Sequence, residues 1–385
     1  MKRLKKILLW FAGILAFLVL LLYITGYDYL LTAIRTIYFN GHVTAFLEDY
    51  QYFDNRTIQN GQAQPWPVAT DYNKIKATDA LEAVHKQAQT VAFLVIKNDS
   101  LWHESYYEDY GKDSQSNSFS MAKSVVSAAL GKAIMEGKIK SLDQKVGDFY
   151  PEFKDGKAAN LTVGDLSSMA SGLNWDENYY SPFSITTRAY FDPELDKCIL
   201  GLKCVDEPGK SYIYLSGNTQ LLAMVVEKAV GKSLADYVSE KFWKPMGAEH
   251  PALWQTDKEN GRVKAYCCIA SNARDFARFG KLYEHYGKWN GQQILDSAFV
   301  AKSIAPRFPD SPQYGYGWWL AEFKGKNVFY MRGHLGQYTI VIPDDKLIIV
   351  RLGKGRLANT DGPHSKDFWV FLEETYKMLG QRSPR

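Results

Sequence analysis

Cysteine is scarce in this chain, with four residues among 385. Cys198 and Cys204 stand close together and Cys267 and Cys268 are adjacent, but neither pair has the C-x-x-C spacing of a metal or redox site. The seven histidines are scattered along the chain. We therefore predict no metal and no other cofactor, and a disulfide between Cys198 and Cys204 in an oxidising compartment.

The chain also lacks runs of positive charge beyond its first six positions. Lysine and arginine number 46 against 42 acidic residues, a net charge of +4. This balance argues against a nucleic acid partner. Internal repeats and low-complexity segments are absent, and the length suits one large domain or two interleaved ones. No pattern in the sequence indicates an oligomeric state.

The longest apolar stretch lies at the N-terminus. Residues 2–6 carry four positive charges, residues 7–24 carry none, and Asp28 is the next charged residue. Eighteen uncharged residues approach the length of a membrane span. By the positive-inside rule we predict a cytoplasmic N-terminus at 1–6 and a transmembrane signal anchor at 7–25. The protein would then be a single-pass protein of the bacterial inner membrane, with its catalytic domain on the periplasmic side.

A cleaved signal peptide is the alternative to an anchor. Its apolar region is usually shorter and is followed by a small-x-small cleavage site. Residues 22–25 read Leu-Tyr-Ile-Thr and offer no such site. Both interpretations export the rest of the chain.

The next segments predict the order of secondary structure. Residues 26–78 include Asn-Gly and Pro-Trp-Pro breaks and are predicted to be a linker that wraps the domain. A short helix is expected over 80–89. Two strands, 91–97 and 101–107, should form a hairpin around Asn98-Asp99-Ser100.

Helices dominate the middle of the chain and strands return at its end. Thr162 to Asp165 resembles a capping box that opens a short helix. The further predictions are a helix over 221–230, strands over 328–331, 338–342 and 347–352, and a closing helix over 368–379. Strands from both ends around central helices indicate an α+β fold, in which one antiparallel sheet with flanking helices carries an inserted, mainly helical region. This domain is predicted to span 79–385.

Ser120 and Lys123 are the candidate catalytic pair. A serine hydroxyl needs a base within hydrogen-bond reach, and a lysine three residues along a helix lies on the same face. The apolar residues that follow recur at helical spacing and predict a buried helix ending near Gly137. Burial favours the neutral form of a lysine, which can accept a proton.

Three motifs in order carry a family resemblance. They are Ser120-Met121-Ala122-Lys123, Tyr214-Leu215-Ser216 and His334-Leu335-Gly336. From about Ala80 onward the chain resembles the serine β-lactamase and penicillin-binding protein superfamily, in the class C, esterase and amidase branch that contains enzymes similar to 6-aminohexanoate-dimer hydrolase. The resemblance implies a β-lactamase/transpeptidase-like fold and a serine hydrolase.

The resemblance also implies roles for individual residues. It places Tyr214 beside Ser120 and Lys123 as a proton-transfer group, and an adjacent ammonium should loosen the phenol proton. It assigns the oxyanion hole to the backbone N–H groups of Ser120 and Gln337. Whether Lys123 or Tyr214 takes the proton from Ser120 stays open.

Two departures from the motifs of β-lactam-recognising relatives bear on the substrate. Ser216 replaces an asparagine, and His334-Leu335 replaces Lys-Thr or Lys-Ser. A site without those polar groups gives little preference to a carboxylate-bearing substrate. The predicted substrate-binding residues are Ser216, His334, Gly336 and Trp318.

The combined prediction is a membrane-anchored, exported serine hydrolase that cleaves a small linear amide or ester through an acyl-enzyme on Ser120. A β-lactamase or D-alanyl-peptide hydrolase is one alternative, and an inactive module that binds cell-wall fragments or a partner is another. Because the apolar span contributes nothing to the predicted site, a chain that begins near Thr70 is expected to stay active.

Overall fold

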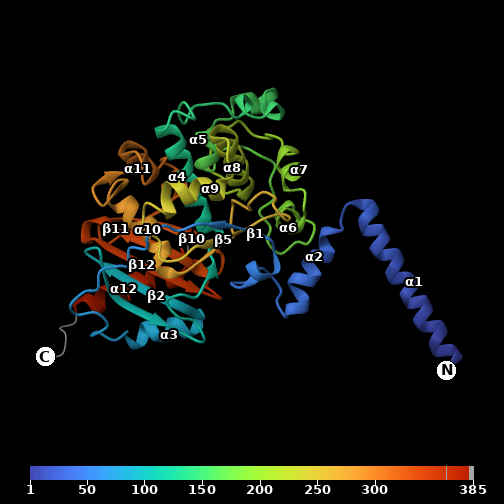
Figure 1. Ribbon diagram of the computed structural model, residues 1–385, viewed down its shortest axis with the longest axis horizontal. Helices are drawn as coiled ribbons and strands as arrows, with labels where there is room; N and C mark the ends of the chain where they lie inside the picture. Colours follow the sequence, from blue (N-terminus) through green and yellow to red (C-terminus); the bar gives the residue numbers. More distant parts are fainter. Residues whose placement is uncertain (361, 381–385) are drawn as a thin grey trace.

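The computed structural model describes residues 1–360 and 362–380. Figure 1 shows a central sheet covered by helices on both faces, a mainly helical region beside it, and helix α1 (Lys2–Thr25) standing apart from the body. This is the predicted α+β architecture, an antiparallel sheet with flanking helices and a mainly helical region.

The main sheet is antiparallel and joins strands from both ends of the chain. Its order is β3-β2-β12-β11-β10-β9. The strands are β2 (Thr90–Lys97), β3 (Ser100–Tyr106), β9 (Trp319–Phe323), β10 (Lys326–Gly333), β11 (Gln337–Ile342) and β12 (Leu347–Gly353). Early strand β2 pairs with late strand β12, from Leu347 opposite Lys97 to Gly353 opposite Thr90. The predicted sharing of one sheet by early and late strands is confirmed.

Strand β2 shows why the sheet needs cover on both faces. Its side chains are apolar at nearly every position, as in a strand buried on both sides. Phe93 and Val95 pack with α3 (Asp79–Gln87) and α12 (Lys366–Gly380), whereas Leu94 and Ile96 face the core beneath α10 (Ala273–Glu284). The sheet is therefore the middle layer of a three-layer sandwich (Figure 1).

A smaller sheet contains β4, the strand that lies just before the S-x-x-K motif in the sequence. Its order is β1-β5-β6-β4, with β1 at Asn55–Ile58, β5 at Ala252–Gln255, β6 at Ile269–Ser271 and β4 at Ser116–Asn117. The helical region contains α4 (Ala122–Met135), α5 (Val163–Ser167), α6 (Ile185–Phe191), α7 (Leu195–Leu200), α8 (Ser216–Val230), α9 (Leu234–Val238) and α11 (Ser297–Ser303). Thr162 caps α5 through the predicted capping box with Asp165.

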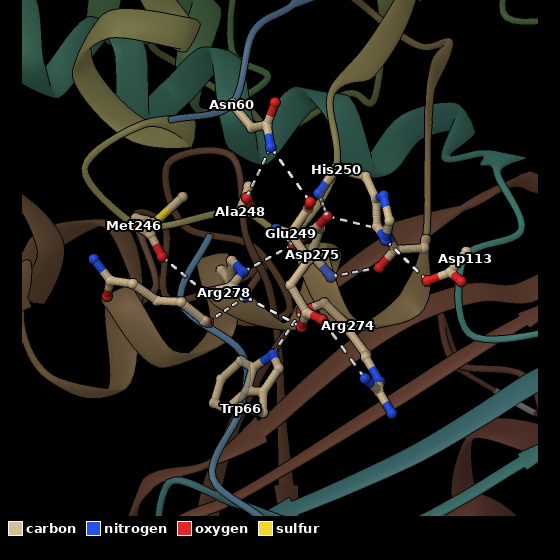
Figure 2. Close-up of polar contacts among 12 residues, drawn as sticks. Asn60, Trp66, Asp113, Met246, Ala248, Glu249, His250, Arg274, Asp275 and Arg278 are labelled. Atoms are coloured by element: carbon tan, nitrogen blue, oxygen red, sulfur yellow. Dashed lines mark hydrogen bonds and ion pairs between the residues drawn. The ribbon is translucent and has the colours of Figure 1, made fainter. Parts of the chain in front are cut away.

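Residues 26–78 belong to the folded unit. Leu47 and Ile58 are fully buried, and β1 pairs with β5. Figure 2 shows Asn60 beside the loop that carries Ala248 and Glu249, and Trp66 beside α10. Trp66 Nε1 donates to the carbonyl of Arg274 at 2.9 Å. Arg278, held by Asp275 at 2.8 Å, donates to the carbonyl of Gln64 at 2.8 Å. The folded domain thus begins before residue 79.

The N-terminal helix is continuous and has no buried residue. It is long and apolar enough to cross a membrane, a property that it shares with signal sequences. It ends at Gly26, whose φ of 70° turns the chain into α2 (Tyr29–Thr36). Helix α2 lies against the body beside α6 (Figure 1), and Tyr29 donates to the carbonyl of Pro182 at 2.9 Å.

The predicted pairing of cysteines is not the one found. Cys267 and Cys268 form a disulfide between adjacent residues, and Cys198 and Cys204 are free thiols. Cys198 lies on α7, whereas the backbone of Cys204 bridges to Leu173 in a separate loop. Proximity in sequence did not bring these two side chains into bonding geometry.

Candidate active site

Ser120 is presented by a sharp turn between β4 and α4. Phe119 has a φ of 45°, an uncommon value for a residue with a side chain, and its backbone N–H donates to Asn117 Oδ1 at 2.8 Å. Ser120 lies in the 3₁₀ turn Phe119–Met121 that opens α4. The predicted helix is confirmed, because α4 ends at Met135 and Gly137 follows with a φ of 67°.

Lys123 lies directly beneath the serine. Its Nζ donates to Ser120 Oγ at 2.8 Å and to the carbonyl of Tyr266 at 2.8 Å. The side chain is buried, and burial lowers the pKa of its ammonium to about 8, although the charge of Glu177 opposes the shift. With this pKa roughly a tenth of Lys123 is neutral at pH 7, and the neutral form is the one that can accept a proton.

Tyr214 is brought to the same place from the start of α8. Its ring centroid lies 5.1 Å from Lys123 Nζ and 5.4 Å from the ring of Trp319. Burial raises the pKa of its phenol, the charge of Glu177 raises it further, and a hydrogen bond with Ser120 lowers it. The expectation of a loosened phenol proton is wrong, because loss of water around the phenolate outweighs the favourable interactions.

Glu177 is a residue of the site that the sequence analysis missed. Its carboxylate accepts from both the backbone N–H and the hydroxyl of Ser216, each at 2.6 Å. It also accepts from the hydroxyl of Tyr179. An anion at the first residue of α8 is favoured by the helix dipole. Nothing in the sequence distinguishes Glu177 from its neighbour Asp176, because the partner lies 39 positions away.

His334 faces the cavity from the turn that follows β10. Its ring lies 5.6 Å from that of Phe119 and 5.5 Å from that of Tyr179. Burial lowers the pKa of the imidazole to about 4, and the charge of Arg356 lowers it as well. At neutral pH His334 is therefore uncharged and cannot replace the family lysine as a positive charge.

Gly336, predicted to bind substrate, lies in the same turn and makes room there for a buried arginine. Its φ is 78°, and a Cβ atom there would lie 2.6 Å from Nη1 of Arg351. Arg351 is buried and donates to the carbonyl groups of Leu335 and Gly336 at 2.9 and 2.8 Å. The glycine accommodates this arginine, and it does not line the cavity described below.

Gln337 follows as the first residue of β11. Its side chain is fully buried and donates to the carbonyl groups of His334 at 3.0 Å and Gly353 at 2.7 Å. These bonds hold the turn in one conformation. The oxyanion role of the Gln337 backbone N–H stays a prediction.

Trp318 is a core residue and does not contact the cavity. It is fully buried, with its ring 4.4 Å from that of Tyr283 and 5.2 Å from that of Phe329. Trp319 points to the opposite side and packs on Tyr214 at 5.4 Å. The prediction that Trp318 binds substrate is wrong, because successive residues of an extended chain face opposite ways.

A cavity of about 310 Å³ opens at Ser120. It is enclosed by α2 and the segment after it, by the loop and helix over 179–191, and by residues around Ser120. Its lining is Leu30, Ala33, Ile34, Ile37, Tyr38, Val43, Thr44, Ala45, Phe119, Ser120, Tyr179, Tyr180, Ser181, Pro182, Thr186, Thr187, Tyr190, Phe191, Ser216, Tyr266, Cys267 and His334. Among the residues that the structure describes, this lining contains no lysine, arginine, aspartate or glutamate.

A group of potential metal ligands lies elsewhere. Asp99, Glu284 and His285 bring ligand atoms within 4.8 Å of one another at the turn between β2 and β3 and the end of α10. Lys281 Nζ lies 3.3 Å from Asp99, so a positive charge is already present. None of these residues lines the cavity at Ser120.

A three-layer α+β fold that carries a serine–lysine pair at the start of a buried helix defines a serine hydrolase. Comparison with known families agrees: residues 56–369 match the family model described as Beta-lactamase, and the chain belongs to this family.

Individual relatives support this placement. The chain is 25% identical over 316 residues to 6-aminohexanoate-dimer hydrolase of Paenarthrobacter ureafaciens, covering 76% of this chain and 80% of that protein. A Bacillus anthracis structure described as a candidate 6-aminohexanoate-dimer hydrolase superposes with a TM-score of 0.71 at 23% identity, covering 87% of this chain and 92% of the other. A family VIII carboxylesterase gives a TM-score of 0.62 at 16% identity, with coverages of 82% and 99%.

Proposed function

We propose that this protein is a membrane-anchored, exported serine hydrolase that cleaves an ester or linear amide through an acyl-enzyme on Ser120. The observation that carries the proposal is the 2.8 Å hydrogen bond between Lys123 Nζ and Ser120 Oγ, made by a buried lysine whose pKa is lowered to about 8. A nucleophile and a base in contact are the signature of covalent catalysis.

In the acylation step Ser120 Oγ attacks the substrate carbonyl while neutral Lys123 accepts the hydroxyl proton. The C–O or C–N bond to the leaving group breaks, and the leaving group takes up a proton through Tyr214. Since burial raises the pKa of Tyr214, its phenol stays protonated and serves as donor and relay, leaving Lys123 as the base. Water then attacks the ester on Ser120 by the reverse proton path.

The backbone N–H groups of Ser120 and Gln337 would stabilise the negative oxygen of the tetrahedral intermediate. The supporting feature is the rigid turn that carries Gln337, which is fixed by its side chain and by Arg351. Preorganised donors are effective because they need no rearrangement as charge develops.

The cavity supports an ester or linear amide rather than a β-lactam or a D-alanyl peptide. A substrate carboxylate needs a positive partner, and the lining offers none. His334 is neutral because burial lowers its pKa to about 4, and the Ser216 hydroxyl already donates to Glu177 at 2.6 Å. His334 and Ser216 stand where β-lactam-recognising relatives have groups that bind the substrate carboxylate or amide. Neither residue is suited to that role here.

Anchoring and export rest on α1. Its 24 residues are unburied, and its charges are confined to the N-terminal end. An apolar helix of this length in water would expose most of its surface, which favours insertion into a bilayer. The positive flank supports a cytoplasmic N-terminus and an external catalytic domain.

The test is covalent labelling of the full-length protein by a fluorophosphonate probe, together with a hydrolysis screen. The screen contains p-nitrophenyl esters, short amide oligomers, D-alanyl peptides and a chromogenic cephalosporin. We expect labelling on Ser120 and turnover of esters or amides, both abolished in Ser120→Ala. Tyr214→Phe should keep its melting temperature and lose turnover, most severely on amides, whose leaving group needs a proton. Absence of labelling in the folded wild-type protein would refute the proposal.

A further inference from the structure

The cavity at Ser120 is walled on one side by the segment that follows the apolar N-terminal helix. Leu30, Ala33, Ile34 and Ile37 line it, at positions i, i+3, i+4 and i+7 of α2 and its last turn. This spacing places the four side chains on one helical face. Helix α2 lies outside residues 56–369, the part of the chain that matches the family model.

The wall is firmly attached to the body. Tyr29 donates to the carbonyl of Pro182 at 2.9 Å, and the guanidinium of Arg188 lies 5.6 Å from the Tyr29 ring. Ala33 and Ile37 are buried against the domain. Since only Gly26 to Asp28 separate α1 from α2, the wall also lies within a few residues of the membrane span (Figure 1).

Large apolar side chains surround the cavity on the same side of the molecule. Ile34 is 40% exposed, Tyr38 60%, Val43 79% and Tyr180 74%, and all four line the cavity. Phe39 and Phe183 are exposed beside them. A cluster of exposed apolar residues of this kind marks a surface that binds another molecule or a membrane. Because the apolar helix α1 adjoins this surface, we infer that it binds the lipid bilayer.

We propose that the substrate is an amphiphile of the membrane surface, an ester or amide with an uncharged alkyl chain that lies in the cavity between α2 and residues 179–191. This inference rests on the proposed function of Ser120. The described lining has no charged side chain to pair with the ammonium or the carboxylate of a zwitterionic amide. Such a lining is suited to hydrocarbon instead. The volume, about 310 Å³, lies near the lower end for small-molecule sites of roughly 300–1,000 Å³, and the cavity holds one chain of moderate length.

The test uses full-length protein in detergent micelles and a series of p-nitrophenyl esters from acetate to octanoate. Burial of each added methylene should raise kcat/KM about fourfold until the cavity is filled. Ile34→Asp places a carboxylate in the α2 wall, and we expect it to lower the octanoate-to-butyrate ratio of kcat/KM at least tenfold. Phe39→Asp is the matched control, because it changes an exposed apolar residue of the same segment that does not line the cavity.

The outcomes separate the two proposals. A flat dependence on chain length in a protein that is labelled on Ser120 would overturn the alkyl-chain inference and leave the hydrolase intact. An equal loss in Ile34→Asp and Phe39→Asp would show that the micelle surface, and not the cavity, sets the preference, and would also overturn it. Loss of labelling and of all ester turnover in the wild type would refute the hydrolase itself.

Discussion

The protonation state of Lys123 determines how the activity of the enzyme should depend on pH. Its ammonium is held between Ser120 Oγ and the carbonyl of Tyr266, and burial lowers its pKa to about 8. The lysine is charged below this pH and neutral above it. Only the neutral form accepts the serine proton, so the fraction of active enzyme rises with pH.

We therefore expect kcat/KM on an ester to rise with pH to a plateau, with a midpoint near pH 8. The slope below the midpoint should be about tenfold per pH unit, as for loss of a single proton. Lys123→Ala should abolish the midpoint and reduce acylation roughly 100- to 10,000-fold. A wild-type profile that stays flat between about pH 6 and about pH 9 would contradict this role.

Glu177 should tune that midpoint. Its negative charge raises the pKa of Lys123 against the effect of burial. Glu177→Gln removes the charge and keeps a carbonyl acceptor for Ser216, so the midpoint of kcat/KM should move to lower pH. Asp176→Asn is the matched control on the preceding residue and should leave the midpoint in place. An upward shift in Glu177→Gln would contradict the electrostatic account.

At the scale of elements, the turn after β10 can be tested through its glycine. Gly336→Ala adds a Cβ atom 2.6 Å from Arg351 Nη1 at a residue with a φ of 78°. We expect a loss of about 1–3 kcal/mol in unfolding free energy and a fall in kcat, because Arg351 must move and the turn carries Gln337. Gly325→Ala, with a φ of 74° and nothing within 4 Å, measures the cost of the backbone conformation alone. Equal effects of the two changes would contradict the packing argument.

The N-terminal segment is the second element with a direct consequence. Asp49 is fully buried and accepts from Asn117 Nδ2 at 2.9 Å, and Asn117 in turn holds the backbone of Phe119 next to Ser120. The family model itself begins at residue 56. These contacts argue against the expectation that a chain beginning at Thr70 keeps its activity.

A chain that begins at Thr70 should be insoluble or show no cooperative melting transition. It lacks Leu47, Ile58 and Trp66, and loss of each large buried side chain costs about 2–5 kcal/mol against a typical total stability of 5–15 kcal/mol. A chain that begins at Tyr27 keeps α2 and β1 and should melt cooperatively and label with fluorophosphonate. Circular dichroism melting curves compare the two. Full activity of the shorter chain would contradict the assignment of these residues to the domain.

At the scale of the whole molecule, α1 determines where the enzyme works. If the helix is an uncleaved anchor, the full-length protein should stay in the membrane fraction after an alkaline wash. Its catalytic domain should be digested by protease added to spheroplasts. A soluble product that begins near Gly26 would identify α1 as a cleaved signal sequence.

The sequence by itself determined the local features. The S-x-x-K pair depends on three-residue spacing along one helix, and the strands and α12 depend on apolar periodicity, so each is decided by nearby residues. The order of three motifs then identified the family. The capping box at Thr162 and the hairpin around Asn98 and Asp99 were predictable for the same reason.

Only the tertiary structure decided features that join distant positions. Glu177 bonds to Ser216 across 39 positions of sequence. Helix α2 lines the same cavity as Ser120, although the two are far apart in the sequence. The apolar spacing of α2 could have predicted an amphipathic helix but not its place. The path of the chain through the fold also decided that Trp318 faces the core. It decided as well that Tyr214 loses enough of its hydration for the pKa of its phenol to rise. Desolvation and contact depend on what the whole chain places around a side chain, and no local pattern encodes that environment.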